Sequence, residues 1–175
     1  MLSETWKNIL DDFRQPISYL IPAIVVTLFG IIIYKVWRKE KAKISIAVIF
    51  LFLYIIVLLQ TAFFSREPGS RNGINLILLS TWGLTTVEHA YFIENIMMFV
   101  PFGVLMPMVW NRMRKVRYCV LIGCLFSCVI ELSQLVTQRG YCQLDDVVTN
   151  TIGSLVGWLI WKTVVAPVLR KYYCR

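Results

Sequence analysis

Two apolar stretches of this chain contain polar side chains that are costly to bury in hydrocarbon. Glu131 and Gln134 lie in the first stretch, Asp146 and Asn150 lie in the second, and a short polar loop joins the two. A carboxyl group in such a setting usually faces a partner or a water-filled cavity. It can bind a polar ligand, or it can act as a general acid or base. The chemistry therefore depends on the elements that position these four side chains.

Composition places both stretches in a membrane. Apolar and aromatic residues make up 58% of the 175 residues, and charged residues make up only 16%. The mean hydropathy of +0.66 is too high for a soluble domain of this size. We expect an all-α, polytopic membrane helical bundle that forms a single domain over residues 1–175.

About five stretches approach the roughly 20 apolar residues that a spanning helix needs. They are residues 16–37, 44–64, 92–110, 118–136 and 147–166. Residues 74–84 are apolar but too few to cross, so we expect an interfacial or re-entrant segment there.

The basic residues predict the orientation of the bundle. Most of the 18 lysines and arginines lie in "RKEKAK", in "NRMRKVR" and near the C-terminus. Short basic loops stay in the cytoplasm, which predicts an external N-terminus and a cytoplasmic C-terminus. The net charge of +8 is then a topology signal, and we expect no nucleic-acid partner.

Helical spacing gathers the polar residues on two faces. Residues three or four apart lie on one side of a helix. The first face holds Ser127, Glu131, Gln134 and Gln138, and the second holds Asp146, Asn150, Gly153 and Gly157. Because the connecting loop is short, the two helices should be antiparallel neighbours whose polar residues converge on an outward-facing pocket.

Some of these polar residues also have a possible structural role, as helix caps or as partners in buried hydrogen bonds and ion pairs. Asp145 or Asp146 would cap the last helix at its N-terminus, and Gly140 would end the preceding helix in a left-handed conformation. Gln134, Gln138 and Asn150 would form hydrogen bonds between helices. Glu131 would form a buried pair with Arg139 or Arg66.

Two segments together resemble a known family. "ENIMMFVPFG" (94–103) and "IELSQLVTQRGYCQLDDVVTNTIGSLVG" (130–157) resemble the VanZ-like membrane proteins, and the resemblance extends over residues 63–161. It implies a multi-pass protein of the bacterial cell membrane with a role in resistance to teicoplanin, a glycopeptide with an acyl chain. The motif positions that carry over are Asn95, Glu131, Gln134, Arg139, Asp145, Asp146 and Asn150.

Two classes of function remain open. In the first, the protein binds or sequesters a membrane lipid or the lipidated glycopeptide, and a kink at Pro101 shapes a groove for the tail. In the second, it is an intramembrane enzyme that acts on a lipid-linked cell-envelope substrate.

The candidate residues take different roles in the two classes. Glu131, Asp145 and Asp146 are the catalytic candidates; Glu131 would be the general acid or base, and the two aspartates would hold a divalent cation. The candidate ligand-binding residues are Arg66, Asn95, Gln134, Arg139 and Asn150. Arg66 and Arg139 would hold a phosphate. Cofactor, natural ligand and oligomeric state stay open.

Overall fold

The computed structural model describes residues 2–12, 17–38, 46–64, 69, 73–80, 82 and 85–173. Its α-helices are α1 (Leu2–Asp12), α3 (Leu20–Arg38), α4 (Ile46–Leu59), α5 (Thr86–Val109), α6 (Val116–Thr137), α7 (Leu144–Ile160) and α8 (Ala166–Tyr173). Its other elements are η1 (Gln60–Phe64), β1 (Ile74–Asn75), η2 (Asn111–Arg114), β2 (Cys142–Gln143) and η3 (Trp161–Val165). The expected all-α class is confirmed.

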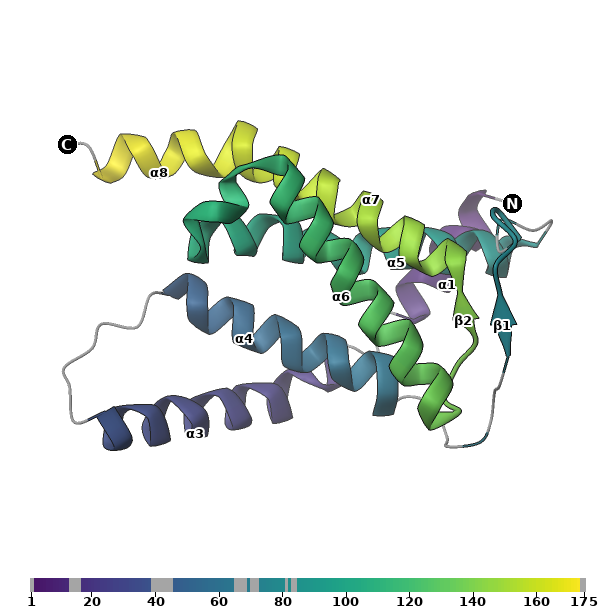
Figure 1. The fold of residues 1–175 in the computed structure, drawn as a ribbon, viewed down its shortest axis with the longest axis horizontal. Coiled ribbons are helices and arrows are strands. Elements are labelled where there is room, and N and C mark those ends of the chain that lie inside the picture. Colours follow the sequence, from purple (N-terminus) through teal and green to yellow (C-terminus); the bar gives the residue numbers. More distant parts are fainter. Residues whose placement is uncertain are drawn as a thin grey trace.

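All five expected helices form, and four of the described spans are long and apolar enough to cross a membrane. These four are Ile46–Phe63, Thr86–Val109, Val116–Thr137 and Leu144–Leu169. The first expected helix is present as α3 but is not among these four. From α3 to α7, successive helices run in alternating directions (Figure 1). The chain is a membrane protein by this pattern.

α1 is not among the helices expected from the sequence. This short amphipathic helix buries Thr5 and Ile9, which lie one turn apart, and it packs against α5. It lies at the end of the molecule opposite α8 (Figure 1).

α5 begins before the expected residue 92 because a capping box starts it. The Thr85 hydroxyl accepts a hydrogen bond from the Glu88 backbone N–H, and the Glu88 carboxylate accepts one from the Thr85 backbone N–H. The helix then continues through Pro101 and Pro107 to Val109.

A loop with a short strand joins α6 to α7. Gln138 adopts the left-handed conformation that ends α6, with φ of 54°, so the expectation that Gly140 does so is wrong. β2 then pairs in parallel with β1, with Ile74 opposite Cys142. α7 starts directly after β2, so α6 and α7 are the antiparallel neighbours that the short loop predicts.

β1 belongs to the expected interfacial segment. The described residues of that segment are not helical, and most of their apolar side chains, including Ile74, Leu76 and Ile77, are exposed. Their depth in the membrane stays a prediction.

Glycines bring α7 close to α5. A Cβ atom on Gly153 would meet the Ile96 carbonyl oxygen, and one on Gly157 would meet the Val100 carbonyl oxygen. The neighbour that both glycines approach is thus α5. An aromatic group of Phe99, Phe102 and Phe126 fills the core beside them.

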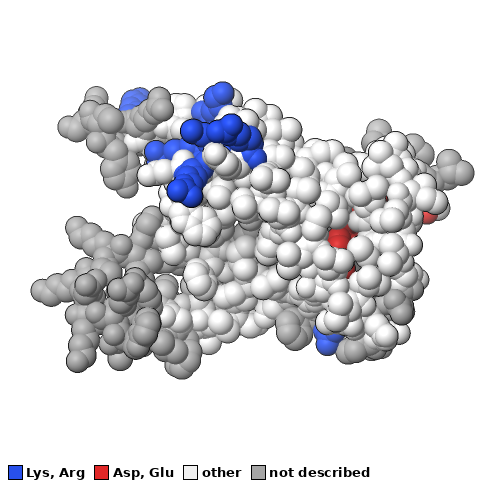
Figure 2. All heavy atoms as spheres, in the orientation of Figure 1, with Lys and Arg blue, Asp and Glu red and all other residues white. Residues whose placement is uncertain are grey.

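Basic side chains concentrate near one end of the long axis (Figure 2). Exposed Arg112, Arg114, Lys115 and Arg117 surround η2 at one end, whereas acidic side chains appear toward the other (Figure 2). The loop between α6 and α7 lies at the end opposite η2 (Figure 1). The assignment of these two ends to the outside and the cytoplasm stays a prediction.

Candidate functional site

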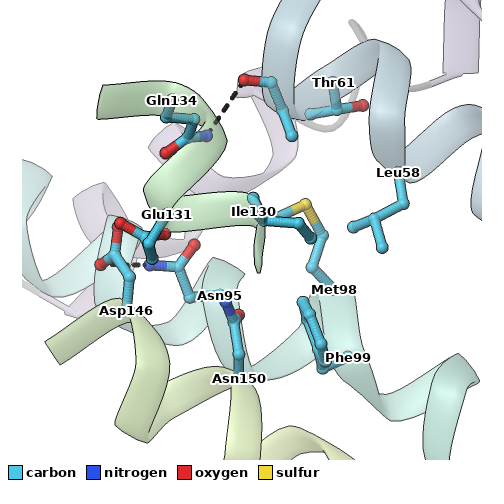
Figure 3. Close-up of a pocket in the computed structure, with 11 residues that line it drawn as sticks. Leu58, Thr61, Asn95, Met98, Phe99, Ile130, Glu131, Gln134, Asp146 and Asn150 are labelled. Atoms are coloured by element: carbon cyan, nitrogen blue, oxygen red, sulfur yellow. Dashed lines mark hydrogen bonds between the residues drawn. The ribbon is translucent and has the colours of Figure 1, made fainter. Parts of the chain in front are cut away.

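A small cavity lies between α4, α5, α6 and α7, near the loop that joins α6 to α7. Its volume is about 50 Å³. The lining residues are Leu58, Thr61, Ala62, Asn95, Met98, Phe99, Ile130, Glu131, Gln134, Asp146 and Asn150 (Figure 3). The structure therefore brings together Glu131, Gln134, Asp146 and Asn150, as the helical spacing predicts.

α6 contributes a carboxyl group and an amide. Glu131 is 3% exposed and Gln134 is 4% exposed. Glu131 lies about 10 Å along the helix from Gln138 at ~1.5 Å per residue, well inside the span. Gln138 itself is exposed and does not line the cavity.

The Gln134 side chain is fixed by a neighbouring helix. Its Nε2 donates a hydrogen bond to the Ala62 carbonyl oxygen at 3.0 Å. Ala62 belongs to η1, a π-helical end of α4 whose carbonyl groups lack the regular helical pattern. A carbonyl can only accept, so the amide nitrogen must face Ala62. Gln134 therefore has the inter-helix role considered for it.

α7 and α5 contribute the opposite wall. Asn95 Nδ2 donates to Asp146 Oδ1 at 2.7 Å, and Asn150 Nδ2 donates to the Ser127 hydroxyl at 2.8 Å. The first bond joins α5 to α7, and the second joins α7 to α6. Figure 3 shows the Glu131 and Asp146 carboxyl groups on the same side of the cavity, beside Asn95.

Glu131 also holds the start of α7. Its Oε2 accepts a hydrogen bond from the Gln143 backbone N–H at 3.0 Å, and Gln143 is the N-cap residue of α7. A negative charge at a helix N-terminus is favoured by the helix dipole. The aspartates occupy the first turn of α7, so the expectation that one of them is its N-cap is wrong.

Two buried oxygen atoms at the cavity have no hydrogen-bond donor. They are Gln134 Oε1 and Asn150 Oδ1, and Asn150 is 3% exposed. The nitrogen of each amide is already bonded to a protein acceptor. A buried acceptor without a donor costs about 1–3 kcal/mol. The cavity thus presents acceptors, and a ligand that donates hydrogen bonds would complete them.

The pKa of the Cys142 thiol, in the loop between α6 and α7, depends on the charge of the cavity. Burial, Glu131 and Asp146, in that order, raise the pKa of its thiol above the usual value. The thiol is therefore a probe of any change in the charge of the two carboxyl groups.

Asp145 has a different role from Asp146. It is 1% exposed and does not line the cavity. Its Oδ1 accepts from the Leu79 backbone N–H at 2.6 Å, and its Oδ2 accepts from the Ser80 hydroxyl at 3.3 Å. Asp145 thus connects the segment that follows β1 to the start of α7. Leu79, whose N–H donates to Asp145, has a positive φ of 61°.

The two aspartates do not converge on one point. Asp145 contacts residues 79 and 80, while Asp146 contacts Asn95. Within the described part of the chain, no group of three or more His, Cys, Asp or Glu residues is arranged to hold a metal ion. This arrangement does not fit the divalent cation considered for the pair.

Of the two candidate arginines, the structure describes only Arg139, and Arg139 is not placed for a phosphate in the cavity. Arg139 donates from Nη1 to the Phe63 carbonyl oxygen at 2.6 Å and is not a lining residue. Arg66 lies outside the described residues. None of the described residues that line the cavity is basic. Pro101 is not a lining residue either, and the groove that its kink would shape stays a prediction.

α4 and η1 form a wall of the cavity that was not expected from the sequence. Leu58, Thr61 and Ala62 close one side of the cavity, and the Thr61 hydroxyl bonds back to the Val57 carbonyl oxygen. The pair Gln60 and Thr61 interrupts an otherwise apolar stretch. That interruption is the signal by which this wall could have been found.

Comparison with known protein families gives a match over most of the chain. A family model described as VanZ/LLP1 matches residues 50–166, more than half of the chain. The range includes all of the cavity-lining residues. No curated protein matches the chain, and no solved structure matches it.

Proposed function

This chain belongs to the VanZ/LLP1 family, and we propose that it lowers the susceptibility of bacteria to teicoplanin from a multi-pass position in the cell membrane. In this proposal the cavity between α4 and α7 binds a polar group of its ligand and catalyses no reaction. The ligand is the lipidated glycopeptide or a membrane lipid.

One observation carries this proposal. Gln134 Oε1 and Asn150 Oδ1 are buried at a cavity without donors, while their amide nitrogens are bonded to the protein. An arrangement that leaves acceptors unsatisfied supports a binding site better than a purely structural network, in which every group is paired.

The size of the cavity limits what enters it. Pockets for whole small ligands have about 300–1,000 Å³, and this cavity has about 50 Å³. A few waters or one small polar group fit this volume, because a water needs at least ~10–15 Å³. The rest of the ligand would lie along the helices or at the membrane surface.

The distribution of charge supports an outward-facing site. Basic residues surround η2, at the end of the bundle opposite the α6–α7 loop (Figures 1 and 2). The preference of basic segments for the cytoplasm would place that loop and the cavity near the outer leaflet. A drug that reaches the cell from outside would meet this side first.

The lining favours binding over the enzymatic alternative. The Thr61 hydroxyl is bonded to a backbone carbonyl, and none of the described lining residues is basic. The described lining thus offers no basic side chain to hold the phosphate of a lipid-linked substrate.

The test is teicoplanin susceptibility of cells that express wild type, Glu131→Gln or Glu88→Gln at matched membrane levels. Glutamine keeps the size of Glu131 and its capacity to accept from Gln143, but it removes the charge. Glu88→Gln removes a carboxylate from α5 outside the cavity and keeps a residue suited to the capping box. We expect protection by wild type and Glu88→Gln and loss of protection in Glu131→Gln.

Vancomycin, which lacks the acyl chain, is the comparison drug in the same cells. Equal protection against both drugs would contradict the role of the lipid chain. An absence of protection by wild type would reject the proposed function as a whole.

A further inference from the structure

We propose that the turn between α5 and α6 binds the head group of an anionic phospholipid, in the leaflet at the η2 end of the bundle. This site is separate from the cavity, and it does not depend on the proposed function. Basic side chains of the turn hold the phosphate, and the exposed face of α6 takes the acyl chains.

Charge is the first argument. The turn carries four exposed basic side chains, which belong to Arg112, Arg114, Lys115 and Arg117 (Figure 2). None of the four forms an ion pair with a described residue. The described carboxylates lie in α1, in the first part of α5, in the second part of α6 and at the start of α7, away from this turn. An anion would therefore supply the counter-charge that the described part of the chain does not.

The geometry of the arginines is the second argument. Arg114 Nε donates to the Pro107 carbonyl oxygen at 3.4 Å, which orients its guanidinium group, and its Nη groups make no bond to a described residue. The Arg117 guanidinium lies over the Tyr118 ring, with its central carbon 4.9 Å from the ring centre. Planar guanidinium groups with free N–H donors match the oxygen atoms of a phosphate better than a point charge does.

The position of the turn is the third argument. α5 ends at Val109 and α6 begins at Val116, and both helices are long and apolar enough to span a membrane. Trp110 and Tyr118 flank the turn and are 58% and 38% exposed. Exposed tryptophan and tyrosine side chains favour the level of the lipid head groups. The basic side chains between them therefore lie at the depth of a lipid phosphate.

An apolar stripe on α6 is the fourth argument. Exposed apolar side chains recur every three or four residues along this helix, at Leu121, Leu125, Val129, Leu132 and Val136. Arg117 and Leu121 are four residues apart, so the basic turn and the stripe share one face of α6. A phosphate held at Arg117 places its acyl chains along this stripe. A free phosphate has no apolar part to use it, which favours a phospholipid.

The first experiment uses the purified full chain in phosphatidylcholine nanodiscs that contain increasing fractions of phosphatidylglycerol. The midpoint of thermal unfolding is followed at low salt. We expect the midpoint to rise with the phosphatidylglycerol fraction and to saturate. Both faces of the protein meet the same lipids in a nanodisc, so the result does not depend on orientation in the cell. A constant midpoint, or a rise without saturation, would overturn the inference.

Matched variants locate the site. Lys115→Gln and Arg117→Gln each remove one positive charge from the turn. Each should raise the phosphatidylglycerol fraction at half-maximal effect about fivefold, as expected for the loss of one basic residue beside an anionic surface. Lys7→Gln makes the same change at an exposed lysine of α1, at the other end of the bundle (Figure 1), and should leave this fraction unchanged. An equal shift in Lys7→Gln would show a general attraction between surface charges and overturn the assignment to the turn.

A soluble phosphate separates a lipid from a free anion. Glycerol phosphate carries the charge of the phosphatidylglycerol head group but no acyl chains. It is added to phosphatidylcholine nanodiscs at the concentrations at which phosphatidylglycerol acts, and we expect no saturable stabilisation. Stabilisation equal to that by phosphatidylglycerol would overturn the phospholipid as the ligand.

Trp110 gives a readout beside the turn that does not depend on stability. Its fluorescence is the difference between a protein and the same protein with Trp110→Phe. Phosphatidylglycerol with brominated acyl chains should quench Trp110 more than brominated phosphatidylcholine at the same fraction. In Arg112→Gln with Arg117→Gln, we expect the two lipids to quench equally.

Two outcomes of the quenching experiment contradict the proposal. Equal quenching of Trp110 by the two lipids in wild type would mean that the turn does not select an anionic head group. An absence of quenching by either lipid would mean that protein, such as a second copy of the chain, covers this face. Either result would overturn the inference.

Discussion

Two successive parts of α7 differ in how closely they approach their neighbours. Near its start, Asp146 and Asn150 border a cavity. Further along the same face, Gly153 and Gly157 leave no room for a single methyl group. α5 shows the same change, from Asn95 at the cavity to Gly103 at the close contact.

The difference between these two parts of α7 explains how a cavity can exist inside a closely packed bundle. Glycines let helix backbones approach and gain dispersion contacts, which stabilise helix pairs in a membrane. Polar side chains hold the backbones apart and bond across the gap, as Asn95 does to Asp146. The close contact between α5 and α7 gives the cavity a rigid base. Substitutions at the glycine contact and beside the cavity test this difference.

The largest effect is expected from Gly153→Ala. The new Cβ would lie against the Ile96 carbonyl oxygen, which belongs to the backbone of α5 and cannot rotate away. The two helices must separate, and we expect a loss of about 3 kcal/mol in the free energy of unfolding. Unfolding of the purified protein in mixed micelles measures this change.

Gly30→Ala is its control. A Cβ at Gly30 in α3 would have no neighbour within 4 Å, so its effect should stay within about 1 kcal/mol. A similar loss in the free energy of unfolding in both variants would mean that the contact between α5 and α7 is no more closely packed than α3.

A smaller effect is expected from Asp145→Ala in the first turn of α7. This change removes the acceptor for the Leu79 N–H and the Ser80 hydroxyl, and it should cost about 2 kcal/mol. Amide hydrogen exchange should become faster at Leu79, whereas Asp145→Asn, which keeps one acceptor oxygen, should show a smaller change. Unaltered exchange at Leu79 in Asp145→Ala would contradict the link between this segment and α7.

The smallest effect concerns the thiol beside the cavity. Glu131→Gln removes a negative charge that raises the pKa of Cys142, so that pKa should fall and alkylation at neutral pH should become faster. Asp146→Asn should act in the same direction but less, because its contribution follows that of Glu131. Burial makes the largest contribution and persists, so the pKa should stay above its usual value in both variants.

The pH dependence of Cys142 alkylation by a membrane-impermeant reagent measures these shifts. Labelling of intact cells at Cys142 also tests the predicted outward orientation. A lack of labelling in intact cells, with labelling after lysis, would invert the topology.

Much of the architecture was predictable from local patterns. Long apolar stretches predicted the helices, and the spacing of Glu131, Gln134, Asp146 and Asn150 predicted their convergence, since helical geometry fixes which residues share a face. The boundaries were less accurate where a local hydrogen bond decides them. The capping box at Thr85 extends α5, and the left-handed Gln138 ends α6 before Gly140.

Partners distant in the chain were not predictable from spacing. The adjacent residues Asp145 and Asp146 suggested one metal-binding pair, yet one contacts residues 79 and 80 and the other contacts Asn95. Neighbours in the first turn of a helix point in different directions, and only the surrounding elements determine what each contacts.

The sequence by itself determined that this chain spans a membrane as helices and that its polar residues share two faces. Hydropathy and helical periodicity are local properties, so no folded neighbour is needed to infer them. Only the tertiary structure decided that α4 closes the cavity, that the glycines approach α5, and that two amide oxygens lack donors. These features depend on where the carbonyl groups of other helices lie, and that position is set by packing across the whole bundle.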